Sequence, residues 1–172
     1  AMVAANNGLA TVIPAAELTE AVRDVAVGAT ATGAGIMTGD VEPWREAIEA
    51  GLRDAGVEPV HPDPHGWRDA AAAAGMGVTS AALAIAATGS LLLVPDADSP
   101  RVASLLPPVH LAVLPVDRLV PGLEDAMAGV AEAAHASSSA VLVTGPSRTS
   151  DIEMTTVYGV HGPRTLRVLL LE

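Results

Sequence analysis

The stretch "GAGIMTGDVEPWREAIEAGLRDAGVEPVHP", residues 33–62, sets the pattern of the chain. Its first part, 33–39, is a short apolar run that favours a strand, and apolar residues then recur at helical spacing over 40–56. Asp40 is expected to cap this helix, acids occupy its first turn, and Gly56 follows its end. Strand character returns at 57–62. The stretch therefore predicts a strand–helix–strand unit.

The same alternation extends in both directions along the chain. A strand is expected at 9–14 and a helix at 15–28. The Ala-rich part, 67–95, is harder to interpret, because apolar runs of this kind do not separate a buried helix from a buried strand. The expected elements after residue 66 are a helix to about residue 74, a loop at 75–77, a helix at 79–86, strands at 89–94, 109–115, 140–145 and 165–171, and helices at 99–105, 119–134 and 150–158.

Apolar strands separated by helices predict an α/β fold with a mostly parallel sheet that is covered on both faces. No internal repeat, long linker or change of composition divides the chain. We therefore expect a single domain over residues 1–172.

Composition excludes several classes of function. The formal charge is −11 and all nine basic residues are Arg, so phosphate backbones and anionic lipids would be repelled. Nucleic acid and membrane surfaces are therefore not expected as partners. With no Cys there is no disulfide, thiolate nucleophile or Cys-ligated iron–sulfur cluster, and with no Lys there is no Schiff base or Walker lysine. No cofactor is expected. No apolar run approaches the ~20 residues of a membrane span, which favours a cytoplasmic protein.

The segment "TGPSRTSDIE", residues 144–153, contains the most suggestive loop. Gly145, Pro146, Ser147 and Arg148 follow a predicted strand and precede a predicted helix, where open α/β sheets bind ligands. Free backbone amides favour an anion there, and the Arg148 guanidinium matches a carboxylate or phosphate. The alternative is that Arg148 is a solvated surface residue.

The second half of that segment has a structural explanation. Ser150 and Glu153 have the spacing of a capping box, and Asp151 would complement the helix dipole. Asp151 is also a candidate acid or base. His161, in "GVHGP" (159–163), titrates near neutral pH and is a second candidate; otherwise it is a loop histidine bonded to backbone. A loop that enters a parallel strand lies opposite the expected crevice, which argues against His161 acting with Arg148.

Two further motifs contain residue types found in binding sites. "HPDPHG" (61–66) places His61, Asp63 and His65 at alternate positions, which in an extended chain would put three metal ligands on one side. Its two prolines and glycine favour a plain turn. "GMGVTS" (75–80) is not a dinucleotide fingerprint, because Ser80 occupies the third glycine position and no strand is predicted before it.

Four segments together resemble the lactate-utilisation protein C family (LutC or YkgG-like proteins), whose members carry a LUD domain. They are "GVTSAALAIAATGS" (77–90), "SLLPPVHLAVLP" (104–115), "TGPSRTSDIE" (144–153) and "GVHGPRTLRVLLLE" (159–172). The resemblance implies the three-layer α/β/α sandwich of the sugar-phosphate isomerase and CoA-transferase (NagB/RpiA/CoA transferase-like) superfamily. It also implies a role in bacterial oxidation of L-lactate to pyruvate, with the iron–sulfur chemistry in partner proteins.

One position departs from the family pattern. An acid usually precedes Thr-Gly in that family, whereas this chain has Ala87 before Thr88 and Gly89. A methyl group cannot transfer protons or attack a thioester, so the CoA-transferase interpretation is weakened and no complete catalytic constellation is identified.

Two hypotheses remain open. In the first, the chain is a non-redox component of a lactate-oxidation system that binds a small anion or a partner. The second is a free-standing enzyme acting on a carboxylate, sugar phosphate or CoA ester, with His161 or Asp151 as acid or base. The residues expected to form the binding crevice are Thr88, Gly89, Gly145, Ser147 and Arg148.

Overall fold

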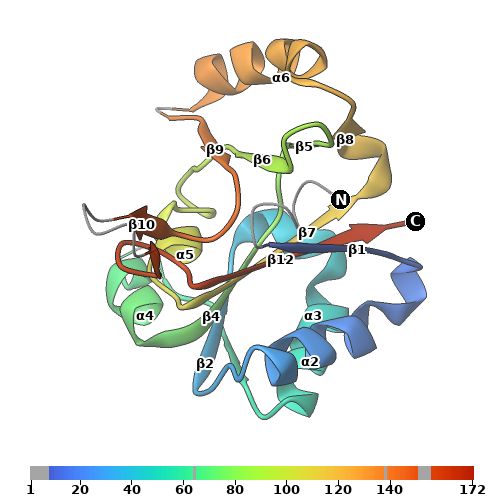
Figure 1. Ribbon diagram of the computed structural model, residues 1–172. Helices are drawn as coiled ribbons and strands as arrows, with labels where there is room; N and C mark the ends of the chain where they lie inside the picture. Colours follow the sequence, from blue (N-terminus) through green and yellow to red (C-terminus); the bar gives the residue numbers. More distant parts are fainter. Residues whose placement is uncertain (1–7, 64, 138, 151–155) are drawn as a thin grey trace.

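A six-stranded parallel sheet forms the centre of the protein in the computed structural model, which describes residues 8–63, 65–137, 139–150 and 156–172. Every neighbouring pair in the order β1-β12-β7-β4-β2-β3 is parallel, as the strand–helix alternation predicted (Figure 1). The strands are β1 (Leu9–Ile13), β2 (Ala34–Met37), β3 (Glu58–Val60), β4 (Ala74–Thr79), β7 (Val109–Pro115) and β12 (Thr165–Leu171).

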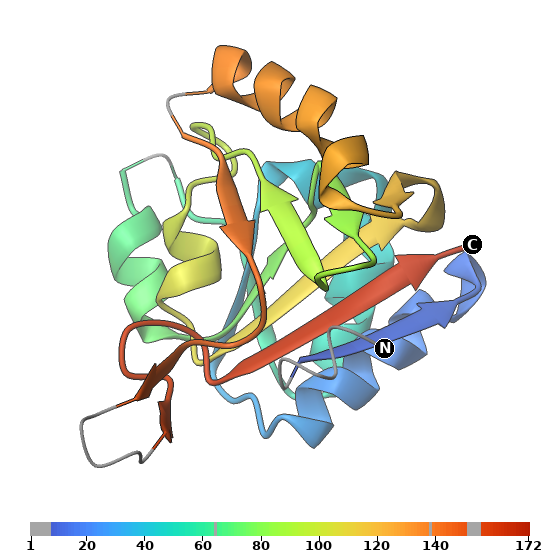
Figure 2. The same ribbon diagram turned by 45° about the horizontal axis from the view of Figure 1, so that its top comes forward.

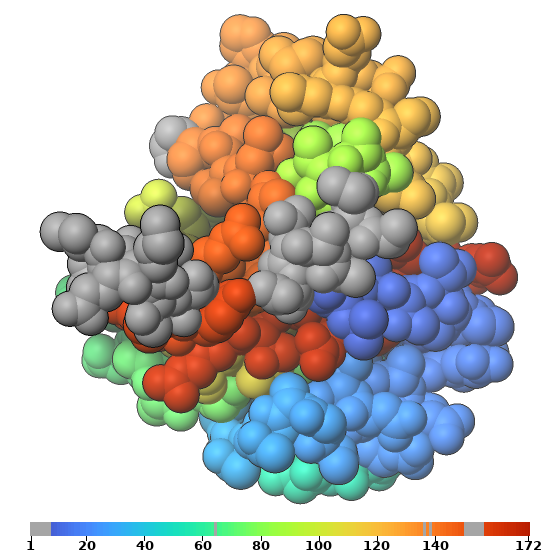
Figure 3. Space-filling view, viewed as in Figure 1, coloured from blue at the N-terminus to red at the C-terminus, as the bar shows by residue number. Residues whose placement is uncertain are grey.

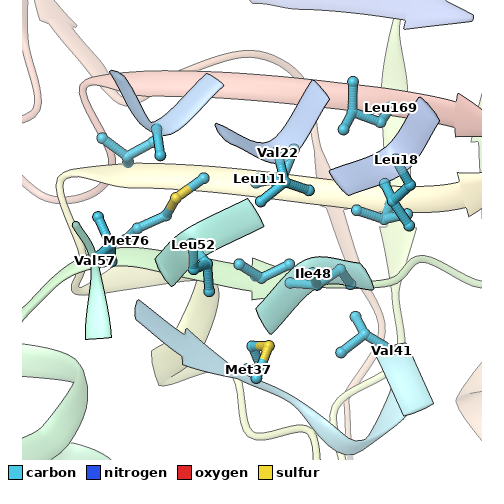
Figure 4. Close-up of a cluster of buried hydrophobic side chains, with 14 of the residues drawn as sticks. Leu18, Val22, Met37, Val41, Ile48, Leu52, Val57, Met76, Leu111 and Leu169 are labelled. Carbon is cyan, nitrogen blue, oxygen red and sulfur yellow. The ribbon is translucent and has the colours of Figure 1, made fainter. Parts of the chain in front are cut away.

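One face of this sheet is covered by two helices that the periodicity predicted. They are α2 (Leu18–Gly28), preceded by the 3₁₀ turn η1 (Ala15–Glu17), and α3 (Arg45–Asp54), preceded by η2 (Gly39–Trp44). Their apolar faces bury Leu18, Val22, Ile48 and Leu52 against Leu111 and its neighbours on the sheet (Figure 4). Burial of this kind contributes ~25 cal/mol for each Å² of apolar surface, which is the main force holding the layers together.

The opposite face carries a second layer, for which the sequence predicted the helices ending near residue 74 and at 99–105 but not a separate small sheet. The helices α4 (Trp67–Ala73) and α5 (Val102–Leu105) cover β2 and β4. A smaller sheet of order β8-β5-β6-β9 lies over β7 and β12 (Figure 2). Its strands are β5 (Leu83–Ile85), β6 (Ser90–Leu93), β8 (Leu119–Val120), which follows the turn η3 (Val116–Arg118), and β9 (Val141–Val143).

A last helix, α6 (Leu123–Ala136), closes the fold on the outer side of the small sheet. Leu83, Ile85 and Leu92 of the small sheet pack against Ala126 and Ala133 of this helix. The space-filling view has α6, coloured orange, at one end and the blue segment containing α2 at the other (Figure 3). None of the helices in the described part of the chain is long and apolar enough to cross a bilayer.

The glycine-containing segment 74–79 was wrongly predicted as a helix end and a loop, and it is the central strand β4. A Cβ at Gly77 would lie 1.9 Å from the carbonyl oxygen of Ala103, and one at Gly75 would lie 2.1 Å from that of Thr32. Glycine is therefore required because neighbouring backbone packs directly onto the strand, and this close packing cannot be seen in the periodicity.

Other segments predicted as helix contain strands, because pairing with neighbouring strands outweighs local propensity. The helix expected at 79–86 is replaced by β5, which pairs with β6 and β8, and α6 starts at Leu123 because Leu119 and Val120 belong to β8. The helix expected at 150–158 is wrong as well, because β10 (Arg148–Ser150) and β11 (Thr156–Tyr158) form an antiparallel hairpin. Ser150 is thus not the N-cap of a helix, while Asp151 and Glu153 lie outside the described residues.

Candidate functional site

A chain of hydroxyl groups joins two of the segments from which the site was predicted. The Oγ1 of Thr88 lies 2.7 Å from the Oγ of Ser90, and this Oγ lies 2.6 Å from the Oγ1 of Thr144. Thr88 is in the turn between β5 and β6, whereas Thr144 directly follows β9. We call Thr88, Ser90 and Thr144 the hydroxyl chain. It places Thr88 and Gly89 beside the start of the loop that leads to Arg148.

Two glycines flank the hydroxyl chain in the left-handed conformation. Gly89 has φ 67° and Gly145 has φ 88°, values that side-chain-bearing residues rarely adopt. Gly89 also donates its N–H to the carbonyl of Ile85 (2.8 Å), which closes the turn. Ala87, where the family pattern has an acid, is solvent-exposed in this turn and donates its N–H to Pro121 (2.9 Å). An acid at position 87 would therefore have faced solvent.

Ser147 and Arg148 do not lie at the carboxyl edge of the parallel sheet. The prediction that their loop forms a ligand-binding crevice at that edge was wrong. The strand before them, β9, belongs to the small sheet and is antiparallel to β6. Ser147 donates its N–H to the carbonyl of Pro163 (2.8 Å), in the loop that leads into the amino end of β12. The loop therefore crosses to the amino edge of the parallel sheet.

The segments that contain Arg148 and His161 meet at that amino edge. Gly159 donates its N–H to the carbonyl of Ser147 (2.8 Å), and Arg148 pairs with Tyr158 in the β10–β11 hairpin. The two loops therefore lie at the same edge of the sheet, and the prediction that placed them at opposite edges was wrong. Arg148 and His161 are both exposed. The second acid or base candidate, Asp151, lies outside the described residues.

In the segment "HPDPHG", the side chains of His61 and Asp63 make hydrogen bonds to different partners. The Oδ1 of Asp63 accepts the N–H groups of His65 and Gly66, both at 2.9 Å. His61 donates to the Oε1 of Glu49 (2.8 Å), and this hydrogen bond, followed by that from Arg53, holds the pKa of Glu49 below its usual value. Over the residues described by the structure, no group of three or more His, Asp or Glu side chains could hold a metal ion.

A second polar cluster, which sequence reasoning missed, lies at the carboxyl edge of the parallel sheet. Thr38 directly follows β2 and Ser80 directly follows the adjacent strand β4. The Oδ1 of Asp40 accepts the hydroxyl of Thr38 and the N–H of Ser80 (3.0 Å). Asp40 in turn donates its N–H to the Oγ of Ser99 (3.1 Å). We call Thr38, Asp40, Ser80 and Ser99 the carboxyl-edge cluster.

The role predicted for Asp40, capping the helix at 40–56, was wrong. Residues 39–44 form a 3₁₀ turn, α3 starts only at Arg45, and the Asp40 carboxylate instead links the ends of two strands. The signal in the sequence was a polar residue directly after each of two apolar strands. It was hidden because the segment ending at Thr79 had been predicted as a loop and helix.

A buried histidine lies near this cluster, on the adjacent strand β7. The Nε2 of His110, on β7, lies 2.9 Å from the Oγ1 of Thr79, the last residue of β4. His110 is 1% exposed, and burial lowers its pKa to about 4. The imidazole is therefore neutral at physiological pH, and its hydrogen bond fixes the Thr79 side chain.

The cluster surrounds a small notch of about 10 Å³, which is room for one oxygen-sized group. Ser80 is 1% exposed, and its Oγ is a buried side-chain oxygen without a hydrogen-bond partner among the described residues. The notch shares Pro95, Pro100 and Arg101 with an open cleft of about 630 Å³. The carboxyl edge therefore offers a buried hydroxyl without a partner among the described residues, in a notch that Arg101 also lines, at the place where parallel α/β sheets bind ligands.

Known proteins are similar to this chain in sequence and in fold. The LUD domain family model matches residues 2–171. The chain is 37% identical over 130 residues to the lactate utilization protein C of Deinococcus radiodurans, covering 75% of this chain and 58% of that protein. It is 35% identical over 103 residues to that of Bacillus subtilis, covering 58% and 43%. The chain thus spans about half the length of the curated relatives it matches.

A solved structure agrees with the fold. A DUF162-family protein from Deinococcus radiodurans, determined at 1.70 Å resolution, superimposes with a TM-score of 0.67 at 23% identity, and the match covers 99% of this chain and 92% of that one. The family match extends over residues 2–171, beyond the four segments that carry the resemblance. The chain belongs to the LUD domain family.

Proposed function

We propose that this chain takes part in bacterial L-lactate utilisation as a component that carries no redox centre of its own. The support comes from its family and from relatives named lactate utilization protein C, one of which aligns with 75% of this chain. The 172 residues contain no Cys, so a Cys-ligated iron–sulfur cluster of such a system would lie outside this sequence. The chain would bind a small anion or such a partner.

The proposed binding surface contains Thr88, Gly89, Gly145, Ser147 and Arg148. The single observation that carries it is the 2.6 Å hydrogen bond between Ser90 and Thr144, which holds two segments distant in sequence together. Both segments are among those that resemble the family. The surface combines hydroxyls, two left-handed glycines and, three residues beyond Gly145, the exposed guanidinium of Arg148, a combination suited to a carboxylate.

A free-standing enzyme acting on a carboxylate, sugar phosphate or CoA ester is the second candidate. It is favoured by the two hydrogen bonds of the Ser147 backbone, to Pro163 and Gly159, which join the His161 loop to the segment of Arg148. His161 or Asp151 would serve as acid or base, with Arg148 holding the anion.

Growth on L-lactate tests the first function. The gene for this protein is deleted in its own bacterium, in a background without another lactate oxidase. We expect loss of growth on L-lactate but not on pyruvate, and recovery with the wild-type gene. Arg148→Ala should restore growth poorly, whereas Arg68→Ala, which removes another exposed arginine, should restore it fully. Normal growth of the deletion strain on L-lactate would contradict the proposal.

Affinity capture separates the two candidates. A tagged copy expressed in lactate-grown cells should retain iron–sulfur proteins if the chain is a component of an oxidation system. Capture of none, together with turnover of a carboxylate, sugar phosphate or CoA ester by the purified protein, would favour the enzyme.

A further inference from the structure

The notch at the carboxyl ends of β2 and β4 contains one polar group with unused bonding capacity. The hydroxyls of Thr38 and Thr79 are engaged, by Asp40 and Val78 and by His110 respectively. The Oγ of Ser80 is buried and has no partner among the described residues. Because an unpaired buried hydroxyl is unfavourable, it is expected to bond to something that enters the notch.

The charges around the notch restrict what can enter. Arg101 lines both the notch and the open cleft, and the carboxylates of Asp40 and Asp96 lie close by. The Oδ1 of Asp96 accepts the N–H groups of Asp98 (2.9 Å) and Ser99 (2.6 Å). One guanidinium beside two carboxylates disfavours a multiply charged anion such as phosphate. It suits a monocarboxylate that also carries a hydroxyl donor for an aspartate.

The dimensions agree with such a ligand. The notch admits one oxygen-sized group, whereas the adjoining cleft of about 630 Å³ holds a larger body. Asp40 is solvent-exposed, so its carboxylate can be reached by a bound molecule. A ligand hydroxyl in the notch can accept from the Oγ of Ser80 and donate to Asp40 while its carboxylate faces Arg101.

We propose that this notch and cleft form a binding site for a small 2-hydroxycarboxylate, held by Ser80, Asp40 and Arg101. The site is separate from the surface of Thr88 to Arg148. The class of ligand is inferred from the geometry and the charges of the notch and the cleft. Only the choice of L-lactate as the probe rests on the proposed function.

Isothermal titration calorimetry of the whole chain tests the site. L-Lactate should bind saturably, and propionate, which lacks the hydroxyl, should bind about fivefold to tenfold more weakly, as expected for one lost hydrogen bond. Arg101→Gln should weaken L-lactate binding about tenfold or more, the usual effect of losing a charge-assisted contact. Arg68→Gln, which removes an exposed arginine outside both proposed sites, is the matched control and should leave this binding unchanged.

Ser80→Ala separates a binding role from a structural one. It should weaken L-lactate binding about fivefold while leaving the thermal midpoint unchanged or raised, because an unsatisfied buried hydroxyl has been removed. A crystal structure with L-lactate should show its hydroxyl in the notch, and a notch that holds only water at saturating L-lactate would contradict the site.

The remaining outcomes distinguish this site from the proposed function. If Arg148→Gln abolishes binding and Arg101→Gln does not, the notch is wrong and the surface of Thr88 to Arg148 is favoured. If no 2-hydroxycarboxylate binds while the deletion strain still fails to grow on L-lactate, the proposed site at the notch is wrong and the proposed function stands. If L-lactate binds at the notch but the deletion strain grows normally, the site stands and the function fails.

Discussion

The Nε2 of His110 lies 2.9 Å from the Oγ1 of Thr79, in the interior between β7 and β4. Burial lowers the pKa of His110 to about 4, whereas an unfolded chain would protonate it near 6.5. Between these values the unfolded state binds more protons, so stability is fully present above pH 6.5 and is lost as pH falls towards 4. The shift corresponds to about 3 kcal/mol.

Replacement of this histidine should therefore remove a specific part of the acid sensitivity. We expect the free energy of unfolding of His110→Gln to fall less than that of the wild type between pH 6.5 and 4, by about 3 kcal/mol at the lower end. Urea denaturation at a series of pH values measures the difference. The other four histidines, His61, His65, His135 and His161, are exposed and remain in both proteins. Parallel pH profiles would contradict the assignment to His110.

The hydroxyl chain can be tested through its central member. Ser90 is 5% exposed and contacts both Thr88 and Thr144, so Ser90→Ala should lower the free energy of unfolding by about 1–2 kcal/mol. Ser139→Ala, a similarly small change at a half-buried position, should stay within about 0.5 kcal/mol. Equal effects of the two substitutions in chemical denaturation would show that the hydrogen bonds of Ser90 do not contribute to the free energy of unfolding.

The central strand β4 should be intolerant of a single methyl group. Gly77→Ala places a Cβ 1.9 Å from the Ala103 carbonyl oxygen and should destabilise by about 3 kcal/mol. Gly28→Ala at the end of α2 meets no atom within 4 Å and should be neutral or stabilise by up to about 1 kcal/mol. Thermal or chemical unfolding measures both, and a neutral Gly77→Ala would mean that α5 is free to move away from the strand.

Asp40 should matter to stability through the acceptor it offers. Asp40→Ala leaves the buried N–H of Ser80 without its partner and should cost about 1–3 kcal/mol. Asp40→Asn keeps an oxygen at this position and should cost less than half as much. Chemical denaturation distinguishes the two, and equal losses would indicate that charge, rather than the hydrogen bond to Ser80, is what the position contributes.

The local sequence pattern was enough to predict much of the parallel sheet. The strands at 109–115 and 165–171 were predicted at the residues where β7 and β12 lie, and the helix over 40–56 contains η2 and α3. These elements are amphipathic or wholly apolar over several residues, so their periodicity reports directly on burial. The family resemblance, carried by the last hundred residues, was confirmed by the match to the LUD domain.

The candidate sites depended on partners distant in sequence. Thr88 and Gly89 were grouped with Gly145 by resemblance, and the hydrogen bond from Ser90 to Thr144 joins those segments, but sequence could not place Ser147 at the amino edge of the sheet. The carboxyl-edge cluster was missed because its members, Thr38, Asp40, Ser80 and Ser99, become neighbours only when β2 and β4 pair.

The sequence alone determined the alternation of strand and helix, the acidic charge and the absence of cysteine and lysine chemistry, because these properties reside in single residues or short periodic segments. Tertiary structure decided that the segments 74–79 and 83–85 are strands rather than helix or loop, because pairing with β2, β7, β6 and β8 and backbone contacts at Gly75 and Gly77 outweigh local propensity. It also decided which hydroxyls meet and which one, on Ser80, is left without a partner among the described residues.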